Sequence, residues 1–173
     1  DPQVPMLVVG QKIFAAIDSF PLMAVPFFVL VGQVMNSGGI TDRIFVFANS
    51  LVGHIRGGLG HVNILSSVLM SGMSGSAVAD AAGLGQVEIK AMVKQGYSRE
   101  FSAAVTAASA TIGPIIPPSI PMVIYGSMAG VSVSQLQVAG LLHGLLIALG
   151  LIAITRINSK RRNNPVSQRA GLG

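Results

Sequence analysis

The charged residues of this chain are confined to short stretches, and long uncharged runs lie between them. No Asp, Glu, Lys or Arg occurs in residues 19–41, 57–79 or 101–155, which are 23, 23 and 55 residues long. A helix needs about 20 apolar residues to cross a hydrocarbon core of about 30 Å. The pattern therefore predicts an all-α integral membrane protein, with a first span over residues 20–35 and a last span over residues 138–155.

The region before residue 57 is predicted to hold scaffold elements. Asn36-Ser37-Gly38-Gly39 follows the first apolar run, and glycine is favoured just after a helix because it adopts left-handed backbone angles easily. Thr41 is then expected to cap a short amphipathic stretch over residues 42–55. Residues 1–56 are thus assigned to N-terminal scaffold span(s) and an amphipathic connector.

The next apolar run is interrupted near its middle. Ser71-Gly72-Met73-Ser74-Gly75-Ser76 divides residues 57–85, and glycines with helix-weakening serines favour a break in the helix. Each arm, 61–70 and about 77–90, reaches only about 15–20 Å, which is about half of a bilayer. The segment is predicted to be a re-entrant helical hairpin over about 59–90.

A second interruption follows a basic connector over residues 88–100. Ser102, Thr106, Ser109 and Gly113 are spaced to share one helix face. Four of the nine prolines then occur in Gly113–Pro121, where no regular helix can continue. We predict a Pro-broken helix over about 101–130. The hairpin, this helix and the last span form a transport-domain repeat over residues 57–155, followed by a basic tail over 156–173.

Composition and charge exclude several classes of protein. The chain is 51% hydrophobic and 10% charged, with a mean hydropathy of +0.68, whereas soluble domains carry about 25% charged residues. Five of the eleven basic residues lie in the tail, so the net charge of +5 indicates membrane orientation rather than nucleic-acid binding. The absence of cysteine excludes disulfides and thiolate metal sites, and the three histidines lack metal-ligand spacing. If residues 57–85 enter and leave on one side and the first span runs inward, ten of the eleven basic residues, including those of the tail, are cytoplasmic.

Two broken helices at membrane depth predict a binding site. Unwound backbone is tolerated there where it is buried or lines a cavity, and transporters use such segments to hold cations and anionic substrates. Hydroxyl and carbonyl oxygens suit Na⁺, and no organic cofactor is expected. The oxygens here come from Ser74, Gly75, Ser76, Thr111, Gly113 and Pro114. The alternative is that these small residues only permit close helix packing.

Three long stretches carry a resemblance to a known family. SFPLMAVPFFVLVGQVMNSGGITDR, GHIRGGLGHVNILSSVLMSGMSGSAVADAAGLG and AAVTAASATIGPIIPPSIPMVIYG resemble the large membrane subunit, DctM type, of TRAP (tripartite ATP-independent periplasmic) transporters. The resemblance covers about residues 5–160. It implies an elevator-type fold of the ion-transporter superfamily, built from two inverted repeats, of which this chain has one. The family's large subunit is more than twice as long, and the chain opens at Asp1 rather than Met, so it is expected to be an N-terminal-half piece.

The resemblance also implies function, partners and site residues. It implies a permease subunit for sodium-driven uptake of C4-dicarboxylates or sialic acids, in the bacterial inner membrane. A DctP-type periplasmic binding protein would deliver the solute, and a DctQ-type small membrane subunit would accompany the large one. By position, Ser74, Gly75 and Ser76 correspond to the hairpin tip and Thr111–Pro114 to the helix break, so Na⁺ is expected at Ser74, Ser76 and Gly113.

Several residues keep two interpretations. Ser119 and Thr106 could contact the ion or substrate, or bond back to their own helices. Asp80 and Ser109 are further candidates, although Asp80 also suits the positive start of the second hairpin arm. Lys90, Lys94 and Arg99 are predicted to anchor the interface, and His143 to pack on an apolar face.

Two other functions compete with transport. Gly72-Met73-Ser74-Gly75 fits an intramembrane serine protease, with Ser74 as nucleophile and His143 as base. A non-transporting structural membrane subunit is the other alternative. The substrate itself is not specified by these residues.

Overall fold

The computed structural model describes residues 6–161, and within that range every regular element is an α-helix. The helices are α1 (Met6–Ile17), α2 (Phe20–Ser37), α3 (Ile40–Val52), α4 (Gly58–Ser74), α5 (Ala77–Ala82), α6 (Leu84–Lys94), α7 (Arg99–Ala110), α8 (Ile120–Ala129) and α9 (Val133–Arg161). The predicted all-α fold class is confirmed for the described residues. Parts of the predicted tail, including Arg162 and Arg169, lie outside them.

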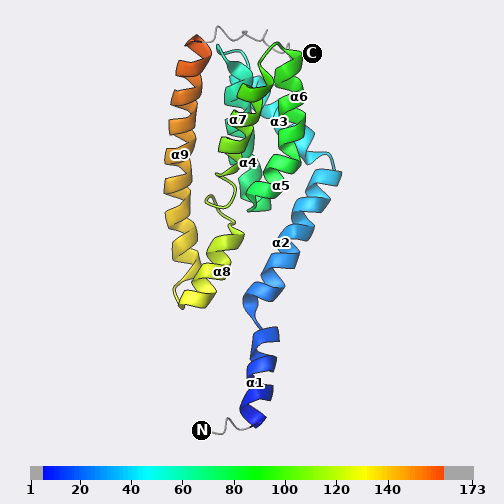
Figure 1. Ribbon diagram of the computed structural model, residues 1–173, viewed down its shortest axis with the longest axis vertical. Coiled ribbons are helices and arrows are strands. Elements are labelled where there is room, and N and C mark those ends of the chain that lie inside the picture. Colours follow the sequence, from blue (N-terminus) through cyan, green and yellow to red (C-terminus); the bar gives the residue numbers. More distant parts are fainter. Residues whose placement is uncertain (1–5, 162–173) are drawn as a thin grey trace.

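The course of the chain is a series of reversals between two ends of the body (Figure 1). Helices α2 and α3 rise to one end, α4 descends from it, and α5 and α6 return to it. Helix α7 then descends again, α8 continues to the opposite end, and α9 runs back along the whole body (Figure 1). The breaks predicted near residues 71–76 and 113–121 thus occur between α4 and α5 and between α7 and α8.

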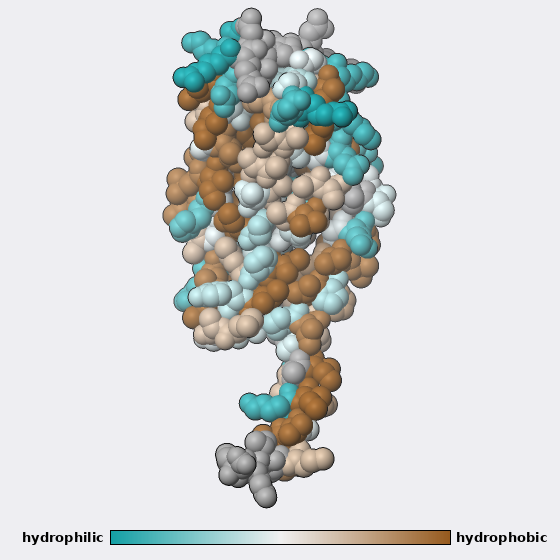
Figure 2. All heavy atoms as spheres, in the orientation of Figure 1, coloured by the Kyte–Doolittle hydropathy of each residue, from teal (hydrophilic) through white to brown (hydrophobic). Residues whose placement is uncertain are grey.

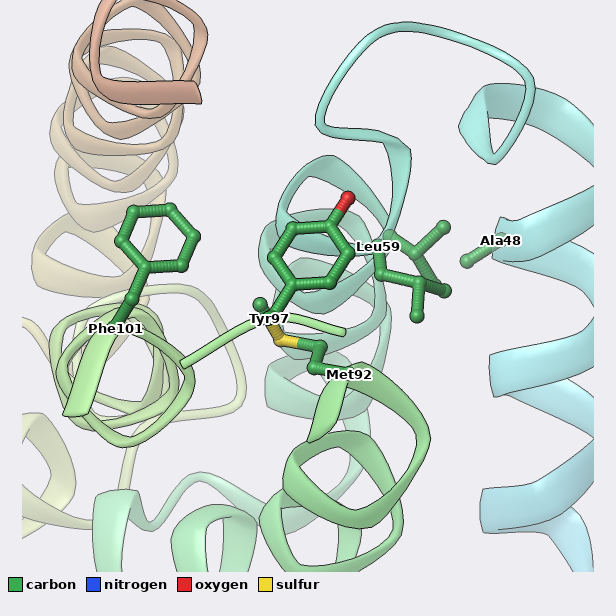
Figure 3. Packing of buried hydrophobic residues seen from close by; sticks show 6 residues of the cluster. Ala48, Leu59, Met92, Tyr97 and Phe101 are labelled. Carbon is green, nitrogen blue, oxygen red and sulfur yellow. The ribbon is translucent and has the colours of Figure 1, made fainter. Parts of the chain in front are cut away.

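One apolar core joins α3, α4, α6 and α7 near the end where the chain reverses most often. Figure 3 shows Leu59 of α4 directed toward Ala48 of α3, with Met92 of α6 beside Tyr97. The rings of Tyr97 and Phe101 stack with their centroids 6.1 Å apart. A hairpin whose arms are held by this core has a fixed position relative to α7.

Helix α9 is packed through its glycines against the irregular segment between α7 and α8. A Cβ atom on Gly140 would lie 2.3 Å from the Ile115 carbonyl oxygen, and one on Gly144 would lie 2.3 Å from Ile116 Cγ1. Ile116 joins Ile64, Ile112 and Ala148 in a second buried cluster. The small residues therefore let a helix approach an unwound backbone closely.

Many large hydrophobic side chains are exposed on the outer surface, and hydrophilic residues gather at one end. Figure 2 shows hydrophilic residues gathered at the end where α3, α6 and α9 finish, with hydrophobic residues below them. Among the helices of residues 6–161, α9 alone is long and apolar enough to cross a membrane, and Pro21–Met35 with Ile40–Val52 meets the same test as a pair bent by 68°. Exposed leucines along α9, such as Leu142 and Leu149 at 63% and 62% exposure, fit contact with lipid better than with water.

Three sequence predictions about local structure are wrong. Thr41 is not a cap, because α3 begins one residue before it and Gly39, with a φ of 73°, is the N-cap. Residues 88–94 belong to helix α6 rather than to a connector, and Glu88 is buried. His143 is exposed, and its Nδ1 lies 2.8 Å from the Ala139 carbonyl oxygen of its own helix, so it does not pack in the core of this chain.

Other boundaries also differ from those expected. The last helix covers Val133–Arg161 and so exceeds the predicted span at both ends. The short apolar helix α1 was not predicted, and it extends away from the body (Figure 1).

Candidate functional site

The first part of the candidate site is the turn between α4 and α5. Gly75 ends α4 with a left-handed φ of 57°, which glycine adopts without the steric cost of a side chain. Ser76 is the N-cap of α5, and its Oγ accepts a hydrogen bond of 3.4 Å from the Ala79 amide. Ser74 Oγ accepts one of 3.4 Å from the Ser76 amide. The tip is thus a compact turn with two hydroxyls and unwound backbone at its centre.

The second part is the unwound segment between α7 and α8. Ser119 is fully buried and is the N-cap of α8, because its Oγ accepts a hydrogen bond from the Met122 amide at 3.2 Å. The same hydroxyl donates to the Pro114 carbonyl at 2.5 Å. The Ser119 amide donates to Gln137 Oε1 of α9 at 3.1 Å. These bonds fix the shape of a segment that cannot hold itself as a helix.

The two unwound segments touch each other. A Cβ atom on Gly75 would lie 2.3 Å from the Pro118 carbonyl oxygen, and one on Gly113 would lie 3.2 Å from the carbonyl carbon of Ser76. Ser74, Gly75 and Gly113 are all buried. The structure therefore brings together the hairpin tip and the helix break, as the sequence predicted.

A cavity of about 280 Å³ opens beside the tip. Ser74 and Ser76 line it from the hairpin, and Gln33 lines it from α2. Gly32 of α2 is close to Ser74, since a Cβ atom there would be 3.9 Å from Ser74 Cα. The remaining walls are largely apolar, from residues such as Phe28, Met70 and Ile120. A few polar groups in an apolar pocket are typical of small-molecule sites.

Some predicted site residues lie away from the tip or are already engaged. Thr111 is exposed, and its hydroxyl donates to the Ala108 carbonyl of the preceding helix at 2.6 Å. The Pro114 carbonyl accepts the Ser119 hydroxyl, and both residues serve first to shape the break. Of the predicted hydroxyl residues, Ser74 and Ser76 lie at the hairpin tip, and Thr111 and Ser119 lie at the two ends of the second unwound segment.

Thr106 and Ser109 belong to a separate buried network between α4 and α7. Asn63 Nδ2 donates to Thr106 Oγ1 at 2.7 Å, and Ser109 Oγ donates to Asn63 Oδ1 at 2.6 Å. Ser67 Oγ donates to Ser109 Oγ at 3.1 Å. Thr106 and Ser109 share the buried face with Ser102, as predicted from their spacing.

Asp80 lies inside the hairpin rather than at its tip. It is 1% exposed, as is Glu88 of α6, and the two carboxyl groups lie near each other. Ser67 lies beside Asp80 and Ser66 beside Glu88, but within the described chain none of the four carboxylate oxygens meets hydrogen-bond geometry. Asp80 is also in the first turn of α5, where a negative charge is favourable.

Four polar residues of this region were not singled out from the sequence: Gln33, Asn63, Ser67 and Glu88. Asn63, Ser67 and Ser74 do follow helical spacing along α4, and such a polar stripe in an uncharged run could have been noticed. Glu88 gave no such signal, because it precedes a lysine in a stretch that reads as a surface connector.

Comparison with known proteins gives a consistent result. Residues 2–172 match the family model "Tripartite ATP-independent periplasmic transporter, DctM component". The chain is 54% identical over 160 residues to the sialic acid TRAP transporter permease protein SiaT of Haemophilus influenzae, which covers 92% of this chain and 26% of the relative. It is 55% identical over 153 residues to the large permease protein SiaM of Vibrio cholerae, covering 88% and 36%.

A more distant relative is named for another substrate. The C4-dicarboxylate TRAP transporter large permease protein DctM of Pseudomonas aeruginosa is 39% identical over 161 residues, covering 93% of this chain and 38% of the relative. The chain thus spans between about a quarter and two fifths of the length of these relatives. All three are named as transport permeases, in agreement with the expectation that the chain is not an enzyme.

Proposed function

The chain belongs to the DctM component family of tripartite ATP-independent periplasmic transporters, and from this premise we propose that it forms one cation-coupled repeat of a carboxylate uptake permease. In this proposal α4 to α6 are a re-entrant hairpin, and α7 and α8 are the two halves of a broken helix of an elevator-type transport domain. The coupling ion is Na⁺. The proposal includes a bacterial inner-membrane location with the end of α9 in the cytoplasm.

The contact between the two unwound segments is the observation that carries the proposal. Gly75 faces the Pro118 carbonyl, and Gly113 faces the Ser76–Ala77 backbone. Carbonyl and hydroxyl oxygens therefore converge without a charged side chain, which suits a weakly held monovalent cation that must be released again. Ser74, Ser76 and the backbone at Gly113 are the proposed Na⁺ ligands, and Asp80, which lies beside Ser67 within the hairpin, is not included among them.

The cavity beside the tip is the proposed solute site of this repeat. Gln33, Ser74 and Ser76 can hydrogen-bond a carboxylate, while its apolar walls exclude water from it. A sialic acid is the first solute to test, because the relatives named for sialic acid are 54–55% identical and the C4-dicarboxylate relative is 39% identical. The proposed partners are a small DctQ-type membrane subunit and a DctP-type periplasmic binding protein.

The sodium site is tested by ion-dependent thermal stability of the purified permease. We expect Na⁺, but not K⁺ or choline at equal ionic strength, to raise the Tm. The double variant S74A/S76A should lose this rise. S50A is the matched control, because Ser50 is exposed on α3 and its hydroxyl bonds to the Phe47 carbonyl of the same helix. An unchanged Na⁺ effect in S74A/S76A would contradict the assignment of these ligands.

Uptake into proteoliposomes tests the transport function. Labelled sialic acid should enter only with an inward Na⁺ gradient, the small subunit and the binding protein present. Na⁺-driven uptake of a C4-dicarboxylate instead of sialic acid would support the proposed mechanism but contradict the proposed substrate. Uptake that is independent of the Na⁺ gradient would refute the coupling.

A further inference from the structure

A basic pocket lies at the polar end of the molecule, at the opposite end of α4 from the hairpin tip. It has a volume of about 290 Å³ and is lined by Ile55, Arg56, Arg156 and Lys160. Ile55 and Arg56 come from the connector between α3 and α4, and the other two residues come from the last turns of α9. Three cationic side chains from two distant segments therefore share one hollow.

Close packing of backbone holds the two walls of this pocket together. Gly57 has a left-handed φ of 75°, and a Cβ atom there would lie 2.3 Å from Ser159 Oγ. A Cβ atom on Gly60 would lie 2.7 Å from Thr155 Cγ2. Ser159 and Thr155 are buried, at 0% and 4% exposure. The pocket is thus part of the packed structure and does not depend on a chance approach of long side chains.

The charges in the pocket favour an anion. Arg156 and Lys160 are four residues apart, so they lie on the same face of α9, and no acidic residue lines the pocket among the described residues. Glu100 is an acidic residue in the first turn of α7, but it lines a different cavity, together with Thr155 and Asn158 of α9. Guanidinium groups bind phosphate in two-point geometry, and an ammonium group adds a further positive charge.

The surroundings favour a phosphate that belongs to a lipid. Beside and below the pocket, α9 exposes Ile157 and Ile154 at 55% and 56%, followed by exposed leucines toward its other end. Figure 2 shows this boundary as hydrophilic residues at the end of the molecule above a hydrophobic surface. A headgroup in the pocket would therefore leave its acyl chains on an apolar face. Basic pockets between membrane helices bind anionic lipid headgroups by the same arrangement.

We propose that Arg56, Arg156 and Lys160 form a binding site for the phosphate of an anionic phospholipid. The site is separate from the proposed sodium and solute sites and does not depend on them. It fixes the end of α9 to the α3–α4 connector through a lipid that both segments contact.

The test counts lipids on the permease as cells produce it. Native mass spectrometry of the protein purified in mild detergent should show retained phosphatidylglycerol, and R156Q/K160Q should lose it. K94Q/R99Q is the matched control, because it also removes two exposed positive charges at the same end but outside the pocket. In lipid titrations followed by Tm, the pocket variant should bind about thirtyfold more weakly, and the control should be nearly unchanged.

Three results would overturn the proposal. An equal loss in both double variants would mean that the charges act only through the general surface potential. Equal stabilisation by inorganic phosphate would mean that the lipid is not the source of the anion. If R156Q/K160Q does not fold, the unmodified protein gives the third result, because equal stabilisation by phosphatidylglycerol and phosphatidylcholine would contradict a site for an anionic lipid.

Discussion

Substitution of Gly75 by alanine is the sharpest test of the contact between the two broken helices. Alanine at a left-handed φ costs about 1–2 kcal/mol by itself. Its Cβ would also lie 2.3 Å from the Pro118 carbonyl oxygen, whereas carbon and oxygen are ordinarily about 3.3 Å apart, so the two segments must separate by about 1 Å. Overpacking of this kind costs about another 1–3 kcal/mol.

Gly130→Ala isolates the backbone part of this effect. Gly130 has a φ of 66°, but among the described atoms nothing lies within 4 Å of the position of its Cβ beyond the immediate chain neighbours. G130A should therefore lose about 1–2 kcal/mol of unfolding free energy, and G75A should lose about 2–5 kcal/mol. The difference between the two variants measures the contact with Pro118.

The same displacement should affect ion binding. Binding constellations tolerate errors of only about 0.5 Å, and a misplacement of about 1 Å can reduce activity about a hundredfold. G75A should lose both the Na⁺-dependent rise in Tm and sodium-driven uptake, and G130A should retain them. Equal stability and equal Na⁺ response in the two variants would refute the close approach of the tip and the break.

Three further substitutions test other parts of the structure. N63A should lose about 1–3 kcal/mol in denaturant unfolding, because it leaves buried hydroxyls on α7 without their partner; a loss below about 0.5 kcal/mol would show that water replaces the amide. G144A should lower the Tm by forcing α9 from the Ile116 side chain, and I116A should relieve part of this loss in the double variant; strict additivity would contradict the contact. E88Q should retain or raise the Tm, because an amide is less costly than a carboxylate to bury without a partner. E100Q is the control, because Glu100 is exposed. A marked drop of the Tm in E88Q but not in E100Q would show that Glu88 needs its charge.

The sequence predicted the two helix breaks because glycine and proline act locally. Pro114, Pro117 and Pro118 exclude a helix whatever surrounds them, and Gly75 ends one for reasons that hold in any context. The contact between the two breaks could also be predicted, because unwound segments in a membrane must satisfy their backbone hydrogen-bonding groups within the protein.

Side-chain directions could not be predicted in the same way. Thr111 bonds back to the preceding helix and Ser119 caps the next one. A serine or threonine hydroxyl can bond to nearby backbone instead of an ion, and the sequence alone does not show which partner it takes. The burial of Glu88 depends on how α6 rotates against α4, which is a tertiary property that the pattern EIKAMVK does not reveal. The basic pocket likewise joins residues a hundred positions apart, so charge counting assigned its members to orientation alone.

The hydrogen bonds between α4 and α7 have a mechanical consequence. Asn63, Thr106, Ser109 and Ser67 are bonded across the interface at buried positions, where water cannot replace a broken partner at once. Sliding of one helix along the other would break several of these bonds together, at about 1–3 kcal/mol for each group left unpaired. The turn at the end of α4 and the unwound segment at the end of α7 therefore belong to a single stiff part, and a hinge must lie outside this pair of helices.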